Sequence, residues 1–375
     1  IFNPSDDFIR EKRLLSYIAT DLPIEGHDCA RIEFLGTCRD ESNPIAVERG
    51  VCGNSDINGD NACGSFCCPV SLAPGEEKSF VFTIGNACDE EEIKEQVASA
   101  SDYPLVHEQL EELKAAWRKN SRYLQVKTPD EQMNTMLNIW HPYQCRMTFN
   151  WSRFISFYER GLDRGWGYRD SMQDVLGVVH SAPDKVKERL RTLMGIQKSD
   201  GNARTLYFPG TGESMGGGRS DDHIWTVFSV CTYVKETGDY GFLEELIPFI
   251  DGGEGTVLQH LKLGLEFTKH HLGEHGVPLF LGSDWNDSLS KISWDKHKAE
   301  SAFVFFQAAH AAYELIHLFE HLKDTENTQW AKQYYEWCRS VEPVLWDGKW
   351  YLRGFTDYGE KYGTDDDEYN KIFLN

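Results

Sequence analysis

The sequence predicts a multidomain protein of mixed α and β structure, in which a β-rich N-terminal part is followed by a helical domain. Up to about residue 90, short runs such as ARIEFLG (30–36) and EKSFVFTIG (77–85) lie between clusters of Gly, Pro, Asn and Asp, as antiparallel strands do. From DEEEIKEQV onward, hydrophobic residues recur at helical spacing instead. This change of period indicates a domain boundary near residue 90.

Helical periodicity is clearest in residues 104–120, 184–198, 224–234 and 300–319. The last of these is apolar nearly all round, whereas 184–198 carries Lys, Arg and Glu on its outer side. Because a helix buried on both sides must be apolar around its circumference, we expect 300–319 in an inner layer and 184–198 in an outer layer. Long polar loops separate the helices, so the pattern favours an (α/α) barrel with a site where the loops converge.

The composition limits the kinds of molecule that this protein is expected to bind. The 375-residue chain is 40% hydrophobic and 26% charged, with a formal net charge of −22, which repels nucleic-acid phosphates and anionic lipid surfaces. A small neutral or polar substrate fits better. No apolar run approaches the roughly 18 to 20 residues needed to span a bilayer, and the N-terminus has no signal-peptide core, so a cytoplasmic location is expected.

Seven of the ten cysteines lie within the first 88 residues, where CGSFCC (63–68) superficially looks like a metal-binding turn. No second CxxC or HxxxH pair completes a set of four zinc ligands. We therefore expect reduced and mostly buried thiols and no metal site.

Residues 279–291, LFLGSDWNDSLSK, place Asp284 and Asp287 on either side of Trp285 and Asn286. A carboxyl group beside an indole and near a second carboxylate has its charged form disfavoured, so Asp287 is a candidate general acid. The alternative is a helix start, with an aspartate capping free amide groups and Trp285 packed inward.

A second candidate segment, NWSRFISFYERGLDRGWGYRDSMQDVLG (150–177), mixes arginines, aspartates and aromatic rings. Sugar sites need this mixture, because rings cover C–H faces while carboxylates and guanidinium groups bind vicinal hydroxyls. Each residue could instead have a structural role, in surface ion pairs or in the core. The residues concerned are Arg153, Arg164, Arg169, Asp163, Asp170, Asp174, Trp151, Trp166, Tyr158 and Tyr168.

Several motifs in the same order resemble those of the inverting β-glycoside phosphorylases of the cellobiose and chitobiose phosphorylase family, glycoside hydrolase family 94. They are SNPIAVERG, NWSRFISFYERG with GYRDSMQD, SDDHIW with YVKETGD, GSDWNDSL, and LRGFTDYGEKYG. The resemblance implies the C-terminal part of a β-sandwich domain over 1–90, a helical linker over 91–125, and the first part of an (α/α) six-hairpin barrel over 126–375. By the same resemblance the chain is expected to be truncated at both ends and to form a homodimer when complete.

The resemblance also implies the chemistry. Asp287 would be the proton donor, and Arg153 and Asp170 would hold the non-reducing sugar. Trp285, Arg169 and Asp222 would be further sugar-binding residues, while Asp284 positions the loop. An inverting hydrolase needs a second carboxylate to activate water, but a phosphorylase does not, because inorganic phosphate is itself the nucleophile. The expected reaction needs no cofactor and converts a β-linked disaccharide, with cellobiose as the default, into an α-sugar 1-phosphate and a free sugar.

Two alternatives stay open. A six-hairpin glycoside hydrolase would need a second catalytic acid, for which Asp222 or Asp163 is available, and a sugar-binding or structural fragment would have no turnover. Gly282 and Ser283 stand where many relatives have Arg-Ala, so a sugar or phosphate contact there is expected to differ.

Overall fold

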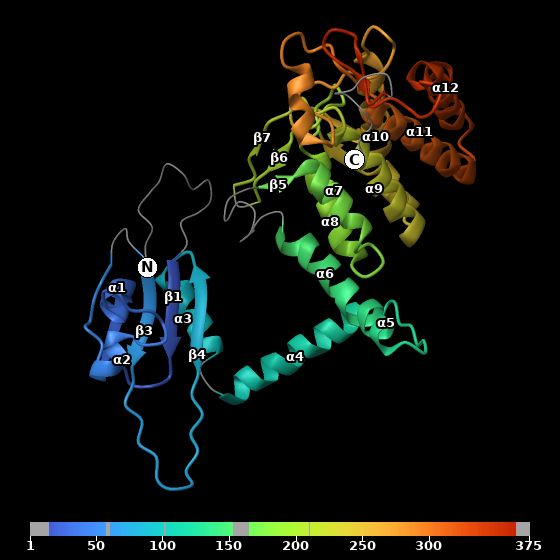
Figure 1. Cartoon of the computed structure of the whole chain (residues 1–375). Helices are drawn as coiled ribbons and strands as arrows, with labels where there is room; N and C mark the ends of the chain where they lie inside the picture. The colour runs from blue at the N-terminus through green and yellow to red at the C-terminus, as the bar shows by residue number, and fades with distance from the viewer. Residues whose placement is uncertain (1–14, 58–60, 101–102, 153–164, 210, 365–375) are drawn as a thin grey trace. The chain divides into compact units, whose positions relative to one another are not determined.

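The computed structural model describes residues 15–57, 61–100, 103–152, 165–209 and 211–364 (Figure 1). The chain divides into two compact units, Ile1–Lys119 and Asn120–Asn375. The division falls within a single long helix, α4 (Tyr103–Ser121).

The described part of the first unit is built from short strands and helices. β1 pairs with β4 and β2 pairs with β3, both antiparallel, and a β-bulge interrupts the second pair between Asp28 and Ala30. The helices α3 and α4 occupy most of the linker expected over 91–125. The elements are β1 (Leu15–Thr20), β2 (Gly26–Ala30), α1 (Arg31–Leu35), α2 (Ile45–Arg49), β3 (Ala62–Cys67), β4 (Phe82–Ala87), α3 (Glu90–Ser99) and α4 (Tyr103–Ser121).

The interpretation of residues 30–36 as a strand is wrong. The strand β2 ends at Ala30, and the next five residues form the helix α1, which buries Leu35 and leaves Ile32 exposed. An apolar run this short fits either a strand or one helical turn, so its period could not decide between them.

The second unit is mainly helical. Four of its described α-helices begin after a residue whose side chain accepts a hydrogen bond from a free backbone N–H, namely Asp130, Thr256, Ser301 and Asp324. Its helices are α5 (Glu131–Thr135), η1 (Met136–Trp140), α6 (His141–Met147), η2 (Thr148–Ser152), α7 (Tyr168–Leu176), α8 (Pro183–Met194), α9 (Asp222–Thr237), η3 (Tyr240–Glu244), α10 (Val257–His270), η4 (Asp287–Ser293), α11 (Ala302–Leu322), α12 (Thr325–Val341) and η5 (Glu342–Leu345). Its strands are β5 (Trp166–Gly167), β6 (Leu206–Tyr207), β7 (Ser214–Met215), β8 (Leu246–Pro248), β9 (Glu254–Thr256), β10 (Glu300–Ser301), β11 (Gly354–Phe355) and β12 (Lys361–Tyr362).

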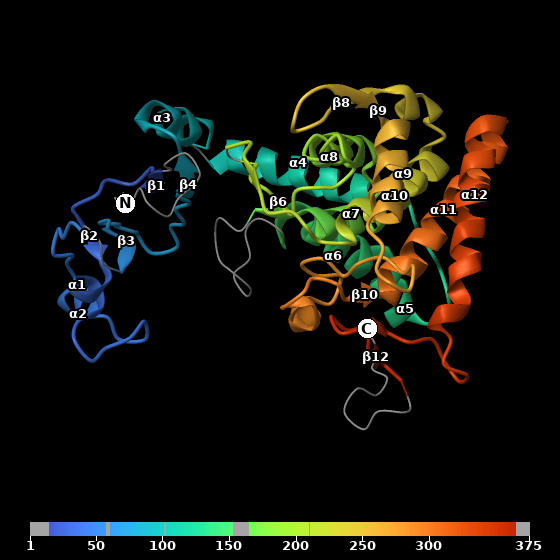
Figure 2. The ribbon, with the colours of Figure 1, turned by 90° about the horizontal axis from the view of Figure 1, so that it is seen from above.

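Helices α7 to α12 lie in two layers. The helices α7, α9 and α11 contact one another in that order, and α8, α10 and α12 each pack against a member of this row. Figure 2 shows α9, α10, α11 and α12 side by side. The inner position of α11 and the amphipathic character of α8 confirm the layering expected from the sequence, because α11 is buried on most sides whereas α8 buries one face. Closure of these layers into a six-hairpin barrel stays a prediction.

The helix α11 is also apolar enough to cross a membrane by length and composition, with a mean hydropathy of 1.2 over its best window. The expectation that no apolar run in the sequence approaches this length is therefore wrong. Of that window, 61% is buried inside the unit, as in the core helix of a globular domain.

Three small antiparallel sheets lie at the helix ends. Their strand orders are β5-β6-β7, β8-β9 and β10-β11-β12, and each strand is two or three residues long. The first joins the start of α7 to residues 206–215, and the third joins the start of α11 to residues 354–362. These sheets therefore hold the loops that carry the polar motifs.

Candidate active site

Two loops distant in sequence pair at the end of the helical layers. Gly216, Gly217 and Gly218 all have positive φ angles, of 75°, 141° and 83°, which a residue with a side chain seldom adopts. They bring the chain against the loop before the DWND motif, where Gly282 N donates to Gly218 O at 2.8 Å and Ser220 N donates to Ser283 O at 3.0 Å. A Cβ atom on Gly282 would lie 3.2 Å from Gly218 O, so this close approach favours glycine.

The paired loops place Arg219 against Asp287. A guanidinium nitrogen of Arg219 donates a short, charge-assisted hydrogen bond to Asp287 Oδ1, which also accepts from Ser283 Oγ at 3.2 Å. Arg169 Nη2 lies 3.4 Å from the same oxygen. Ser283, which stands where relatives were expected to have another residue, thus contacts the candidate acid directly.

The expectation that its neighbours hold a proton on Asp287 is wrong for this state of the site. Burial raises the pKa of the Asp287 carboxyl group, but the hydrogen bond and charge of Arg219, with the charge of Arg169, lower it below its ordinary value. Its side chain is 58% exposed, so solvent reaches it. At neutral pH Asp287 is therefore a carboxylate.

Asp284 is in a different environment. Its side chain is fully buried, and its carboxylate accepts from Asn286 N at 2.9 Å, Ser301 Oγ at 2.6 Å and Arg353 Nη2 at 2.5 Å. These partners come from the motif itself, from the start of α11 and from the start of β11. These hydrogen bonds tie the loop to the helix and strand that follow it, so Asp284 anchors the loop.

The capping interpretation of the motif is correct in type but names the wrong residue. The short helix η4 begins directly after Asn286, whose side-chain oxygen accepts from Ser288 N at 3.1 Å. Trp285 is 39% exposed, and its ring centre lies 6.4 Å from that of Phe303. The asparagine caps the helix, and the tryptophan is only partly packed.

Arg169 connects the site to the first inner helix, α7. Its Nη1 donates to Asp284 O at 3.1 Å and lies 3.5 Å from Asp221 Oδ2, while its Nε lies 3.7 Å from Asp170 Oδ1. Burial lowers the pKa of Arg169, but the acidic groups around it, Asp221 first, raise it overall. Arg169 therefore keeps its charge and neutralises a cluster of carboxylates.

Asp221 and Asp222 stand side by side at the start of α9, and both are almost completely buried. Burial raises the pKa of Asp221 to about 6, although the Arg169 charge lowers it. Burial and then the charge of Asp221 raise the pKa of Asp222 well above its ordinary value. Asp222 Oδ2 is buried without a hydrogen-bond partner among the described residues.

Most of the predicted site residues line one small cavity of about 90 Å³. Four of the six, Asp287, Asp170, Arg169 and Asp222, line it. Trp285 is not among its lining residues, and Arg153 lies outside the described residues, as do Asp163, Arg164 and Tyr158. The other lining residues are Gly167, Tyr168, Thr205, Leu206 and Arg219.

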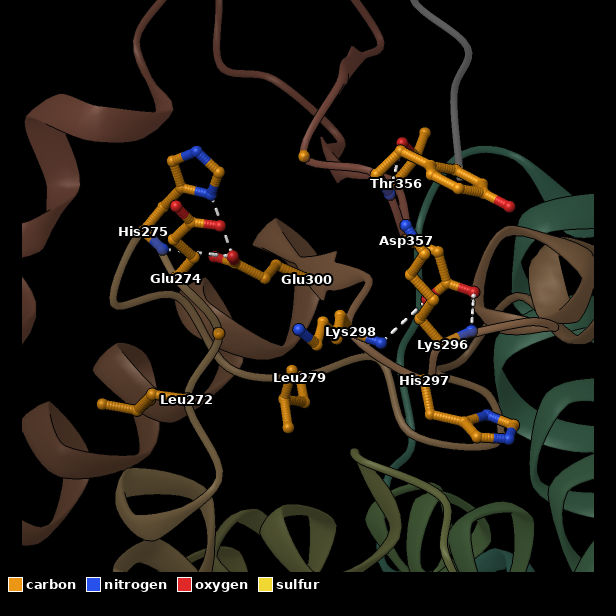
Figure 3. A pocket seen from close by; sticks show the side chains of 13 residues that line it. Leu272, Glu274, His275, Leu279, Lys296, His297, Lys298, Glu300, Thr356 and Asp357 are labelled. Carbon is orange, nitrogen blue, oxygen red and sulfur yellow. Dashed lines mark hydrogen bonds and ion pairs between the residues drawn. The ribbon is translucent and has the colours of Figure 1, made fainter.

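A larger cavity of about 610 Å³ lies elsewhere in the unit and shares no lining residue with the first (Figure 3). Its two buried carboxylates already have structural partners. Glu300 accepts from the backbone and ring nitrogens of His275, and Asp357 accepts four backbone N–H groups, of Asp295, Lys296, Lys298 and Ala299. These acids organise loops, so this cavity is the weaker candidate for acid chemistry.

Sequence reasoning missed Arg219, Asp221 and Arg353 as parts of the site. Arg219 directly precedes the SDDHIW motif, and Asp221 belongs to it. Arg353 belongs to the LRGFTDYGEKYG motif. Arg219 could have been found from the sequence, because it directly precedes a recognised motif and follows three consecutive glycines, which indicate a tight loop. Nothing local in the sequence pairs Arg353 with Asp284.

Comparison with known proteins agrees with this layout. Residues 116–375 match the glycosyl hydrolase 94 superfamily catalytic domain, and residues 3–103 match the glycosyl hydrolase 94 supersandwich domain. The chain belongs to this superfamily. The resemblance inferred from the motifs is thereby confirmed, together with an N-terminal supersandwich domain and a helical catalytic domain.

Three curated relatives show the range of the superfamily. The chain is 33% identical to N,N'-diacetylchitobiose phosphorylase of Vibrio proteolyticus, over 96% of this chain and 47% of the relative. It is 29% identical to solabiose phosphorylase of Paenibacillus borealis, over 96% and 45%, and 27% identical to cyclic β-(1,2)-glucan synthase NdvB of Rhizobium meliloti, over 93% and 13%. The chain spans about half the length of the two phosphorylases.

Proposed function

We propose that the complete protein cleaves a β-linked disaccharide by phosphorolysis with inversion, giving an α-sugar 1-phosphate and a free sugar. The superfamily membership supports the reaction type, since the curated relatives include phosphorylases of disaccharides. The observation that carries the proposal is the difference between the two acids of the DWND motif. Asp287 faces a cavity and solvent, whereas Asp284 is buried and fully bonded.

Asp287 is the proton donor in this proposal. A general acid must carry a proton when the glycosidic bond breaks, and Arg219 lowers the pKa of Asp287 in the empty site. Binding of the substrate must therefore separate the two side chains, which also enlarges a cavity too small for a sugar ring. Asp287 then protonates the leaving sugar oxygen while phosphate attacks the anomeric carbon from the opposite face.

The state of Asp222 favours phosphate over water as the nucleophile. An inverting hydrolase needs an ionised carboxylate to take a proton from water. Asp222 lies in the same cavity, but burial and the neighbouring Asp221 raise its pKa well above the ordinary value and so disfavour the charged form that such a base must have. In its neutral form Asp222 is suited to donate a hydrogen bond to a sugar hydroxyl.

Arg169 and Asp170 are placed to contact the sugar at the same cavity, and we extend this role to Arg153 and Trp285 on the family pattern. Vicinal hydroxyl groups suit the paired oxygens of a carboxylate and the paired nitrogens of a guanidinium group. These contacts hold the reacting sugar, so their loss should lower both affinity and turnover.

The substrate we propose first is N,N'-diacetylchitobiose, because a chitobiose phosphorylase is 33% identical over nearly the whole chain. Cellobiose, the default from the sequence, has no specific support among these relatives. A homodimer and a cytoplasmic location remain parts of the proposal that rest on the family resemblance and the composition.

The test is an assay of the complete protein with each disaccharide, with and without inorganic phosphate. We expect phosphate-dependent cleavage, with the α anomer of the sugar phosphate observed by NMR, and loss of this activity in Asp287→Asn. Cleavage that proceeds equally well without phosphate would establish the hydrolase alternative.

A further inference from the structure

Three side chains of metal-binding type meet in the first unit, far in sequence from the candidate active site. They are His27 and Cys29, both on β2, and Asp56, which follows the short segment that bridges to β2. One ligand atom from each lies within 4.8 Å of the other two, and His27 Nε2 is 3.8 Å from Asp56 Oδ1. Residues two apart on a strand point to the same side, so His27 and Cys29 share a face.

The loop that carries Asp56 is held in place by hydrogen bonds. The carboxylate of Asp28, which is 1% exposed, accepts from Gly53 N at 3.0 Å and from Ser55 N and Ser55 Oγ at 3.1 and 2.7 Å. In addition, Cys29 N donates to Ser55 O at 2.8 Å, and His27 N donates to Asn54 Oδ1 at 3.0 Å. The backbones on both sides of the cluster are therefore fixed relative to each other before any ion binds.

We propose that His27, Cys29 and Asp56 form a binding site for Zn²⁺ or a similar borderline-soft divalent ion. Thiolate, imidazole and carboxylate are the ligands that zinc takes, and hard ions such as Mg²⁺ and Ca²⁺ prefer oxygen alone. Ligands around tetrahedral zinc are roughly 3.5 Å apart, given bond lengths of about 2.0 to 2.3 Å. The His27 Nε2 to Asp56 Oδ1 distance of 3.8 Å is already close to this value, and these side chains, 41% and 97% exposed, are not held rigidly by packing.

Three protein ligands leave the fourth position of a tetrahedral ion open to water. The expectation that the thiols of this unit are mostly buried is wrong, because all seven are half-buried or exposed. Two thiols near the cluster have other partners: Cys63 Sγ donates to Asp28 O, and Cys52 Sγ lies 3.7 Å from Ser65 Oγ. The sequence argument against a metal rested on the absence of paired CxxC or HxxxH spacings. A ligand set built from one strand and a neighbouring loop does not produce such spacings.

The experiment uses the full chain, reduced and stripped with a chelator, and titrates it with Co²⁺ followed by competition with Zn²⁺. We expect one equivalent of Co²⁺ to give visible d–d bands and a thiolate charge-transfer band, and Zn²⁺ to abolish both. Cys29→Ser should lose the charge-transfer band, and His27→Ala should weaken binding by about 100-fold, at least as much as loss of an outer-shell partner.

Cys63→Ser is the matched control, because it removes a nearby thiol of the same strand pair that is not a ligand in this proposal. It should keep the spectrum and the affinity of the unchanged protein. Circular dichroism of each metal-free variant establishes that it is folded, and Asp56→Asn gives a second test, since its exposed side chain is not needed for folding. Absence of Co²⁺ bands in the unchanged protein, or equal losses in Cys29→Ser and Cys63→Ser, would overturn the proposal.

Discussion

The buried ion pair between Asp284 and Arg353 gives the sharpest test of how the candidate site is held. The side chains are 0% and 9% exposed, and the pair is joined by a 2.5 Å hydrogen bond. Replacing Arg353 with Met keeps an apolar stem beside Phe303 but leaves the Asp284 carboxylate buried without its cation. Removal of one partner of a buried pair costs about 3 to 5 kcal/mol.

For a unit of this size, a loss of 1 kcal/mol lowers the melting temperature by about 2 to 4 °C, so Arg353→Met should lower it by on the order of 10 °C. The assay is thermal and urea unfolding of the chain, followed by circular dichroism. Lys185→Ala is the matched control: it breaks the solvent-exposed pair with Glu188, and exposed pairs contribute about 0 to 1 kcal/mol.

A double-mutant cycle with Asp284→Asn separates the pair from its surroundings, because the double variant no longer contains an unpaired buried charge. We expect the double variant to have a higher free energy of unfolding than the Arg353→Met variant. If Arg353→Met costs less than about 1 kcal/mol, no more than an exposed pair contributes, then Asp284 is not anchored by this contact and the reasoning is refuted.

Three further predictions concern the cavity. In the complete protein, Asp287→Asn should lower phosphorolysis by about 10² to 10⁴-fold while sugar affinity changes little, as measured by kinetics and calorimetry; near-normal turnover would exclude Asp287 as the acid. Arg219→Gln removes the cation that lowers the pKa of Asp287, so the basic limb of the pH profile of kcat/KM should move to higher pH, and an unchanged limb would show that Arg219 does not control that proton. Because the pKa values of Asp221 and Asp222 are raised in the folded state, that state binds more protons and its stability falls as pH rises above about 4. Asp222→Asn should therefore flatten the decline in unfolding free energy as the pH rises above about 4, and a decline as steep as in the unchanged chain would contradict the assignment.

The sequence identified the elements whose signal is local. The helices α8, α9 and α11 follow from hydrophobic periodicity, which reports the burial of one face or of most of the circumference. The helix α4 forms where its periodicity predicts, although none of its residues is buried. The same reasoning failed at 30–36, where the run was too short for a period to be measured.

The site was predictable in its members but not in its electrostatics. Four predicted residues from three motifs, spread over the 118 positions from Arg169 to Asp287, line one cavity. This grouping could be predicted because the motifs together resemble those of one family. The protonation of Asp287 was predicted incorrectly, since it depends on Arg219, which lies 68 positions earlier in sequence and reaches Asp287 only through the pairing of two loops. Local composition suggested a neighbouring acid and indole, whereas the structure supplies two arginines.

The distance in sequence between Asp284 and Arg353 has a consequence for synthesis of the chain. The two residues are 69 positions apart, and ribosomes add about 5 to 20 residues per second. Arg353 is therefore synthesised on the order of 3 to 14 seconds after Asp284. During that interval a carboxylate intended for the interior has no charge partner, and its burial is opposed. The emerging polypeptide therefore has reason to keep the DWND loop hydrated until α11, α12 and the following strand have left the ribosome.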